Sequence, residues 1–174
     1  GAVVTDERFA TSVPGIYALG DAVAGNVQLA HVASEDGHRF IASLYADDLK
    51  PEPAIPSCVY TSPEIAQIGD TEASYGEKGG TAVSARVPMG GNARTTIADD
   101  PRSFVKLVAD AETGILVGAS MYSAHATELI DEAAVAIAAG YTIQELIDEV
   151  MRPHPTYAES FEDALRALKA KLEK

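Results

Sequence analysis

A histidine between two prolines, followed five positions later by a glutamate, is the part of this sequence best suited to chemistry. These residues are Pro153, His154, Pro155 and Glu159. A histidine that transfers protons needs a fixed position and a carboxylate that holds one ring nitrogen while the other reacts. Each proline fixes its own φ and restricts the residue before it, so the two prolines stiffen the backbone around His154. The pattern indicates an acid/base pair, His154 and Glu159, on a tight turn.

The same residues also fit a purely structural explanation. Thr156 and Glu159 have the spacing of a capping box, in which the threonine hydroxyl caps a helix and the glutamate reaches back to the threonine amide. Apolar residues then recur at helical spacing from Phe161 to Leu172. The local pattern leaves two explanations open: a catalytic pair, or a plain turn followed by a capped helix that starts at Thr156.

A second stretch with the residue types of a ligand site lies near the N-terminus. The apolar pattern predicts strands at Gly1–Asp6 and Ile16–Leu19, and the second strand ends at Gly20 and Asp21. Glycine allows a close approach, and the carboxylate can accept hydrogen bonds from sugar-like hydroxyls at the end of a strand. A helix predicted over residues 29–49 follows, and its first amides can face an electron-rich group. An ordinary Gly-Asp turn explains the same residues equally well.

Composition restricts the classes of function. The 174 residues carry 13 basic and 26 acidic side chains, and the net charge of −13 disfavours binding to nucleic acid or to anionic membranes. The single cysteine, Cys58, excludes an intrachain disulfide framework and fits a buried position in a strand. The sequence shows no signal-peptide pattern and no apolar run long enough to cross a bilayer, so we expect a cytoplasmic protein.

The predicted elements divide the chain into two segments. Prolines concentrate in residues 50–56, so we place the boundary there and expect domains at residues 1–50 and 51–174. The second segment is predicted to contain strands at 57–60, 65–69, 81–87, 104–109 and 115–121, and helices at 71–78, 127–139, 142–151 and from 156 onward. This order predicts an α+β fold, in which an antiparallel sheet has helices packed on it.

Taken together, these stretches resemble the flavin-dependent pyridine nucleotide–disulfide oxidoreductases. The stretch Thr11–Asp21 is similar to the second flavin motif of that family, and residues 29–37 are similar to the helix start beneath the flavin ring. Residues 55–66 look like the opening of its dimerisation domain, and Glu128–Ile130 and His154–Glu159 complete the match. The resemblance covers nearly the whole chain and is greatest to the members that oxidise dihydrolipoamide.

The resemblance implies a flavin site at the first segment, which would be the C-terminal remnant of an α/β FAD-binding domain. Asp21, next to Gly20, would bind a ribityl hydroxyl of FAD. The backbone amides of Ala30, His31 and Val32 would lie near the pyrimidine edge of the flavin.

The resemblance also implies a catalytic role for the histidine between the prolines. His154 would take a proton from the substrate dithiol, so that a thiolate can attack a redox disulfide of the partner subunit, and Glu159 would orient His154. The active site would then exist only in a homodimer. The peptide bond between His154 and Pro155 is expected to be cis.

The sequence also departs from the family. It contains no Gly-x-Gly-x-x-Gly fingerprint and no Cys-x4-Cys pair, and the pair Arg152–Pro153 is unusual before the histidine. We therefore interpret the chain as a fragment, inactive and without FAD when alone, of an enzyme that passes electrons from dihydrolipoamide through FAD to NAD.

Several expectations and alternatives accompany that interpretation. The expected partners are a second copy of the chain and the lipoyl-bearing subunits of a 2-oxo acid dehydrogenase complex. The alternatives are a glutathione or mercuric reductase of the same family and a non-catalytic dimerisation module. A metal site is not expected, because His31 and His38 lack supporting carboxylate or cysteine ligands in the pattern.

Overall fold

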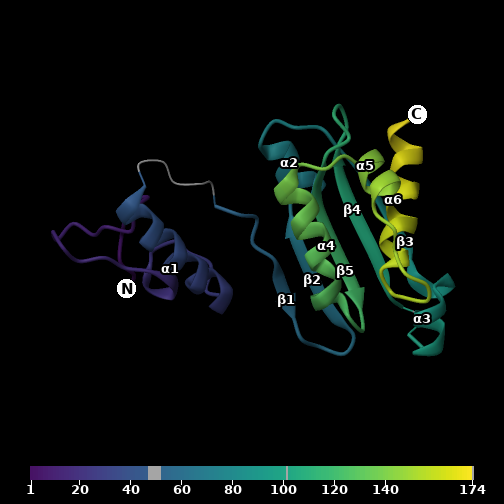
Figure 1. Ribbon diagram of the computed structural model, residues 1–174, viewed down its shortest axis with the longest axis horizontal. Helices are drawn as coiled ribbons and strands as arrows, with labels where there is room; N and C mark the ends of the chain where they lie inside the picture. Colours follow the sequence, from purple (N-terminus) through teal and green to yellow (C-terminus); the bar gives the residue numbers. More distant parts are fainter. Residues whose placement is uncertain (47–51, 101, 174) are drawn as a thin grey trace. The chain divides into compact units, whose positions relative to one another are not determined.

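The computed structural model describes residues 1–46, 52–100 and 102–173 (Figure 1). The chain divides into two compact units, Gly1–Glu52 and Pro53–Lys174. Among the helices of the described stretches, none combines the length and the apolar character needed to cross a bilayer.

The first unit is built on one long helix. The helix α1 (Ala30–Tyr45) is preceded by loops and by the short 3-10 helix η1 (Gly20–Ala22). Phe40 on α1 contacts two aromatic rings of the preceding loops, with ring centroids 6.3 Å from Phe9 and 4.9 Å from Tyr17. These contacts hold the loops against the helix.

The prediction of two strands in the first unit is wrong. In the described part of this unit, isolated bridges pair Val3 with Val23 and Ala10 with Tyr17, and no longer ladder forms. A strand is stable only when neighbouring strands pair along its length. Ile16, the first residue of the second predicted strand, is 54% exposed as a result.

The predicted helix of residues 29–49 forms with shorter limits. It begins at Ala30 and ends at Tyr45, followed by Ala46 in an extended conformation. Residues 47–49 of the prediction lie outside the described residues.

The second unit contains a five-stranded antiparallel sheet, as predicted, with the strand order β1-β2-β5-β4-β3. Its strands are β1 (Ser57–Val59), β2 (Glu64–Gly69), β3 (Ala82–Pro88), β4 (Phe104–Asp110) and β5 (Leu116–Ser123). Its helices are α2 (Glu72–Glu77), α3 (Ala93–Ile97), α4 (Ala126–Ala139), α5 (Ile143–Glu149) and α6 (Glu159–Leu172), with the 3-10 helix η2 at Met89–Gly91. The α+β fold predicted from the sequence is therefore confirmed.

Two helices cover one face of the sheet. In Figure 1, α4 lies over β2 and β5, and α6 lies over β3 and β4. Alternate strand residues point into one core with these helices, among them Ala66, Ile68, Val105, Leu107, Met121, Ile130, Ala133, Phe161, Leu165 and Leu168. Complete burial of each large apolar side chain contributes about 2 kcal/mol of stability, so this core fixes α6 on the sheet.

The opposite face of the sheet is polar near α2. Glu72 on α2 bonds Lys106 on β4 at 2.6 Å and also accepts a hydrogen bond from Ser84 on β3. The Lys106 ammonium, followed by the Ser84 hydroxyl, lowers the pKa of Glu72 to about 2. These bonds attach α2 to the two strands.

Local capping signals explain several of the helix limits. Thr71 caps α2 and Thr142 caps α5, each in a complete capping box. Gly140 ends α4 in the left-handed conformation, at φ +70°, which glycine adopts without strain.

The last helix starts later than predicted. It begins at Glu159, and its N-cap, Ala158, makes no side-chain capping bond. The Thr156 hydroxyl donates to the carbonyl of Pro153 at 2.7 Å, so it does not cap the helix. Half of the predicted capping box forms, because the Thr156 amide donates to a Glu159 oxygen at 2.8 Å.

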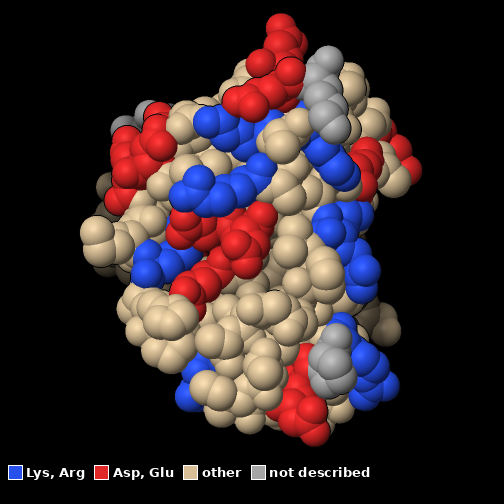
Figure 2. Space-filling model, turned by 90° about the vertical axis from the view of Figure 1, so that its right-hand side faces the viewer, with Lys and Arg blue, Asp and Glu red and all other residues tan. Residues whose placement is uncertain are grey.

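Acidic and basic side chains lie next to one another on the face shown in Figure 2. Arg166 pairs with Glu162 on α6 at 2.6 Å, and Lys169 of α6 pairs with Glu173, the residue after the helix, at 3.7 Å. These exposed pairs contribute less than about 1 kcal/mol each. The acidic excess of the chain is thus accompanied by local charge pairing on this helix.

Gly118 gives a test of the packing at the centre of the sheet. A Cβ at this position would lie 1.8 Å from the carbonyl oxygen of Asp70, whereas a Cβ at Gly76 on α2 meets nothing within 4 Å. We expect Gly118→Ala to reduce the free energy of unfolding by about 3 kcal/mol, because backbone has to move. The control Gly76→Ala should leave stability unchanged or raise it by up to about 1 kcal/mol. Urea denaturation of both variants measures the difference, and equal stabilities would contradict this packing.

Candidate functional site

The predicted acid/base residues are in contact. His154 Nδ1 lies 2.8 Å from Glu159 Oε1, and the side chain of His154 is 74% exposed. The peptide bond between His154 and Pro155 is cis, as predicted. A carboxylate at Nδ1 favours the tautomer with a proton on Nδ1, which leaves Nε2 as a proton acceptor on the exposed part of the ring.

Glu159 is held by two different donors. One carboxylate oxygen faces His154, and the other accepts the Thr156 amide at 2.8 Å. The Thr156 amide, and then the His154 ring, lower the pKa of Glu159 below its usual value of 4.5. The carboxylate therefore stays ionised at neutral pH and fixed in orientation, which are the two properties an orienting group needs.

Arg152, which the sequence marks as unusual before the histidine, is a buried structural residue. Its side chain is 2% exposed and pairs with Glu132 on α4, and it lies 3.6 Å from Glu162 on α6. Burial raises the pKa of Glu132, and the neighbouring guanidinium acts in the opposite direction. Arg152 therefore fixes the backbone next to Pro153 and does not face an incoming ligand.

Gly20 contacts protein rather than open space. It adopts φ +60°, and a Cβ there would lie 2.7 Å from Cβ of Ala33, so η1 packs directly on the first turns of α1. The Gly20 amide donates to the buried carboxylate of Asp36 at 2.9 Å. Asn26 donates to the same carboxylate oxygen at 2.7 Å, so Asp36 fixes both ends of this turn.

The predicted flavin-facing groups gather at one end of α1. The neighbouring residue Asp21 is exposed, and so are Ala30 and His31, while Val32 is buried in the unit. The N-cap residue, Leu29, makes no side-chain capping bond to the 16-residue helix. The Asp21 carboxylate can accept hydrogen bonds from hydroxyl groups, and the amides at the helix N-terminus can donate to carbonyl oxygens. These two groups fit the ribityl chain and the ring carbonyls of a flavin.

The two predicted sites belong to different units. Gly20, Asp21 and the α1 N-terminus lie in the first unit, and His154 and Glu159 lie in the second. Within each unit the predicted residues are neighbours.

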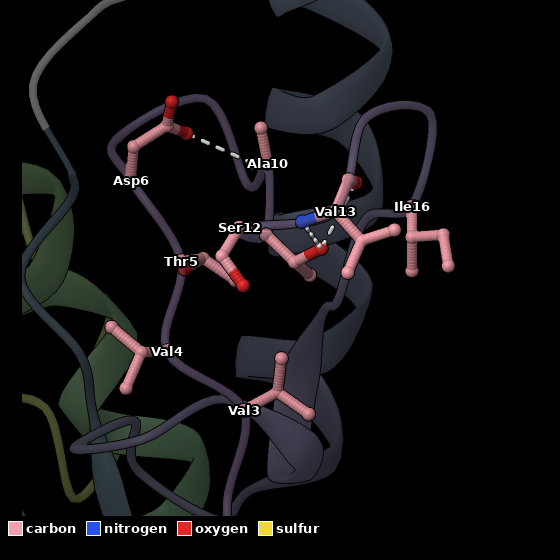
Figure 3. Close-up of a pocket in the computed structure, with 9 residues that line it drawn as sticks. Val3, Val4, Thr5, Asp6, Ala10, Ser12, Val13 and Ile16 are labelled. Carbon is pink, nitrogen blue, oxygen red and sulfur yellow. Dashed lines mark hydrogen bonds between the residues drawn. The ribbon is translucent and has the colours of Figure 1, made fainter.

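Other features of the described residues carry no comparable chemistry. A hollow of about 750 Å³ in the first unit is lined by apolar side chains such as Val4, Val13 and Ile16 (Figure 3), and no predicted site residue lines it. Within the described stretches, no group of three histidine, cysteine or acidic residues could hold a metal. Burial, followed by nearby carboxylates, raises the pKa of Cys58, so its thiol is protonated at neutral pH.

Comparison with known proteins identifies the family. Residues 55–165 match the dimerisation domain of the pyridine nucleotide-disulphide oxidoreductases, and residues 1–37 match the pyridine nucleotide-disulphide oxidoreductase domain. The first match alone covers more than half of the chain. The chain therefore belongs to the pyridine nucleotide-disulphide oxidoreductase family, as its motifs indicated.

Similar sequences include several dihydrolipoyl dehydrogenases. One from Haloferax volcanii is 37% identical over 94% of this chain and 34% of its own length, and one from Bacillus subtilis is 36% identical over 91% and 34%. A leghemoglobin reductase from Glycine max is 35% identical over 96% of the chain and 32% of its own length. The chain thus spans about a third of the length of the relatives it matches.

Solved structures of the family share the fold. LpdA from Mycobacterium tuberculosis superposes with a TM-score of 0.83 at 30% identity, over 95% of this chain and 36% of that one. The HOCl-induced flavoprotein disulfide reductase RclA from Escherichia coli has a TM-score of 0.85 at 25% identity, over 95% and 38%.

Sequence analysis missed Asp36 and Arg152, which position the predicted residues. Asp36 follows Val32 by one helical turn, so its place on the buried face of α1 was readable from the helical period. Arg152 gave no such signal, because its partners are distant in sequence.

Titration of Glu159 tests the geometry of the pair. Its folded-state pKa is lowered, so the stability that its carboxylate contributes is present at neutral pH and is lost as the pH falls through that pKa, below 4.5. We expect His154→Ala to raise the pKa of Glu159 only part of the way, because the Thr156 amide is the larger cause. Carbon-detected NMR of the carboxyl group measures this, and a complete return to 4.5 in His154→Ala would contradict it.

Proposed function

We propose that this chain is part of a dihydrolipoyl dehydrogenase, an NAD-dependent flavoprotein that oxidises dihydrolipoamide to lipoamide. In this proposal residues 1–50 are the end of the FAD-binding domain, and residues 51–174 form the dimerisation domain. The family membership and the dihydrolipoyl dehydrogenases among the relatives support the proposal.

The observation that carries the catalytic part is the hydrogen-bonded pair of His154 and Glu159. An exposed imidazole with one nitrogen held at 2.8 Å by an ionised carboxylate is arranged to accept a proton at the other nitrogen. The carboxylate also stabilises the imidazolium that forms.

The proposed reaction is a thiol–disulfide exchange in two displacements, and His154 takes the proton of the first thiol. Nε2 of His154 accepts the proton of a substrate thiol, and the resulting thiolate attacks one sulfur of a redox disulfide supplied by the rest of the full-length enzyme. The new bond is a mixed disulfide, and the other sulfur of the broken disulfide leaves as a thiolate. The second substrate thiol then displaces the enzyme sulfur from the mixed disulfide and gives its own proton to that departing sulfur. The substrate is thereby oxidised to a disulfide, and the enzyme disulfide is reduced.

The first unit would contribute one side of the FAD site. Asp21, beside Gly20, would accept a hydrogen bond from a ribityl hydroxyl, and the amides of Ala30, His31 and Val32 would face the pyrimidine edge. Bound FAD would supply the electron acceptor for the reduced enzyme dithiol, with NAD as the final acceptor. The part of the site that binds NAD is not among these residues, so the chain alone should be inactive.

The proposed partners are a second copy of the chain and the lipoyl-bearing subunits of a 2-oxo acid dehydrogenase complex, in the cytoplasm. The match to a dimerisation domain supports the homodimer. The second unit also leaves large apolar side chains exposed, namely Val59, Tyr60, Ile65, Ile97, Val135 and Met151. Such side chains are suited to burial between subunits.

The catalytic proposal predicts a selective loss of activity. In a full-length enzyme that carries this segment, His154→Gln should lower turnover with dihydrolipoamide by on the order of 10²–10⁴, because the dithiol loses its proton acceptor. Reduction of an artificial acceptor by NADH through the flavin should be retained, since that reaction needs no thiol deprotonation. Glu159→Gln should cause a smaller loss. Unchanged dihydrolipoamide oxidation in His154→Gln would refute the assignment.

The homodimer can be tested with the chain itself. Analytical ultracentrifugation at micromolar concentration should give about twice the mass of the 18.2 kDa chain. Dissociation on dilution should follow a monomer–dimer equilibrium. A single species with the monomer mass at these concentrations would contradict the proposal.

A further inference from the structure

The turn that carries His154 is bonded to a segment far away in the sequence. Asn92 lies between β3 and β4, and its Nδ2 donates to the carbonyl oxygen of Thr156 at 2.8 Å, across 64 positions of the chain. The Asn92 side chain is buried, with 7% of the residue exposed. A hydrogen bond made under such burial is costly to lose, because the Thr156 carbonyl would be left without this donor.

This bond is the first of three that lead to the histidine. Asn92 holds the carbonyl of Thr156, the amide of Thr156 holds one oxygen of Glu159, and the other oxygen of Glu159 holds His154 Nδ1. Each of the three distances is 2.8 Å. The position of residue 156 therefore decides where the Glu159 carboxylate sits, and Asn92 contacts that residue from outside the turn.

The same segment contacts the residue after Thr156. Tyr157 is 8% exposed, and its ring centroid lies 4.8 Å from that of His125 and 5.9 Å from the guanidinium carbon of Arg94. After His154, the turn is thus held by Arg94 of α3 and by His125 at the start of α4. Before His154, it is held by Arg152.

We propose that Asn92 is a positioning residue for the His154–Glu159 pair, acting through Thr156. Its catalytic meaning rests on the function proposed above, whereas its effect on Glu159 does not. A side-chain amide suits this position because the residue there must both accept one hydrogen bond and donate another. The Asn92 oxygen accepts the Thr95 amide at 3.1 Å and so caps α3, while the nitrogen holds Thr156.

These two tasks can be separated by substitution. Asn92→Ser keeps a neutral oxygen that can cap α3 but removes the nitrogen donor to Thr156. Asn92→Thr does the same and serves as the second variant if Asn92→Ser does not fold. Thr96→Gly is the matched control. It weakens α3 and removes the bond of the Thr96 hydroxyl to the Asn92 backbone carbonyl at 3.0 Å, but it keeps the Asn92 side-chain nitrogen that holds Thr156.

The readout is the titration of the Glu159 carboxyl group, followed by carbon-detected NMR in the 174-residue chain. In Asn92→Ser we expect the pKa of Glu159 to rise toward 4.5, because the Thr156 amide is no longer held against the carboxylate. Thr96→Gly should lower the thermal stability at least as much as Asn92→Ser does, but it should leave the pKa of Glu159 unchanged. An unchanged pKa in Asn92→Ser and Asn92→Thr, or an equal rise in Thr96→Gly, would overturn the proposal.

Kinetics in a full-length enzyme separate this inference from the proposed function. Asn92→Ser should lower kcat with dihydrolipoamide about tenfold and leave the KM for NAD unchanged, since a positioning residue acts on proton transfer. A shifted Glu159 titration with unchanged kcat would support Asn92 as the residue that positions Glu159 and would contradict its role in the proposed proton transfer. The role of His154 itself is tested separately by His154→Gln.

Discussion

The helical layer of the second unit depends on the buried guanidinium of Arg152. It pairs with Glu132 on α4, approaches Glu162 on α6, and donates to the carbonyl oxygens of Leu146 and Val150 at the end of α5. One cation thus satisfies groups on three helices. Removing one partner of such a buried pair typically costs about 3–5 kcal/mol, because the remaining charge stays buried without compensation. The three helices are therefore fixed relative to one another at the point where the chain turns toward the histidine.

This arrangement explains how an exposed histidine has a defined position. Arg152 fixes the backbone before the turn, and the buried ring of Tyr157 fixes it afterwards. Between them the imidazole of His154 is 74% exposed, and Glu159 holds it through Nδ1. A reactive ring with a free face normally samples several rotamers, so rigid anchors on both sides of the turn lower the entropy cost of reaching the reactive geometry.

The sequence predicted the second unit well because its signals are local. The caps at Thr71 and Thr142 and the glycine that ends α4 at Gly140 depend on neighbouring residues, and the three helices they bound lie close to their predicted limits. The pairing of His154 with Glu159 is local as well, at five positions apart.

The features that the sequence predicted wrongly, or did not predict, depend mostly on contacts with distant parts of the chain. The strands of the first unit needed neighbouring strands, which no local pattern supplies, and Ile16 is exposed as a result. The start of α6 was misplaced because the Thr156 hydroxyl bonds the carbonyl of Pro153 instead of capping the helix. The bonds of Arg152 to Glu132 and of Asn92 to Thr156 join residues 20 and 64 positions apart, so only the folded chain reveals them.

The match to a dimerisation domain, residues 55–165, includes both His154 and Glu159. Under the proposed function, the segment that joins two subunits therefore also carries the acid/base. The exposed ring would meet its disulfide only when a second copy brings it, so association and proton transfer would share one surface. Subunit association follows mass action, and activity would then fall on dilution along with the fraction of dimer. A rigid turn suits this arrangement, because the second subunit can align with the histidine only if the ring is already in place before association.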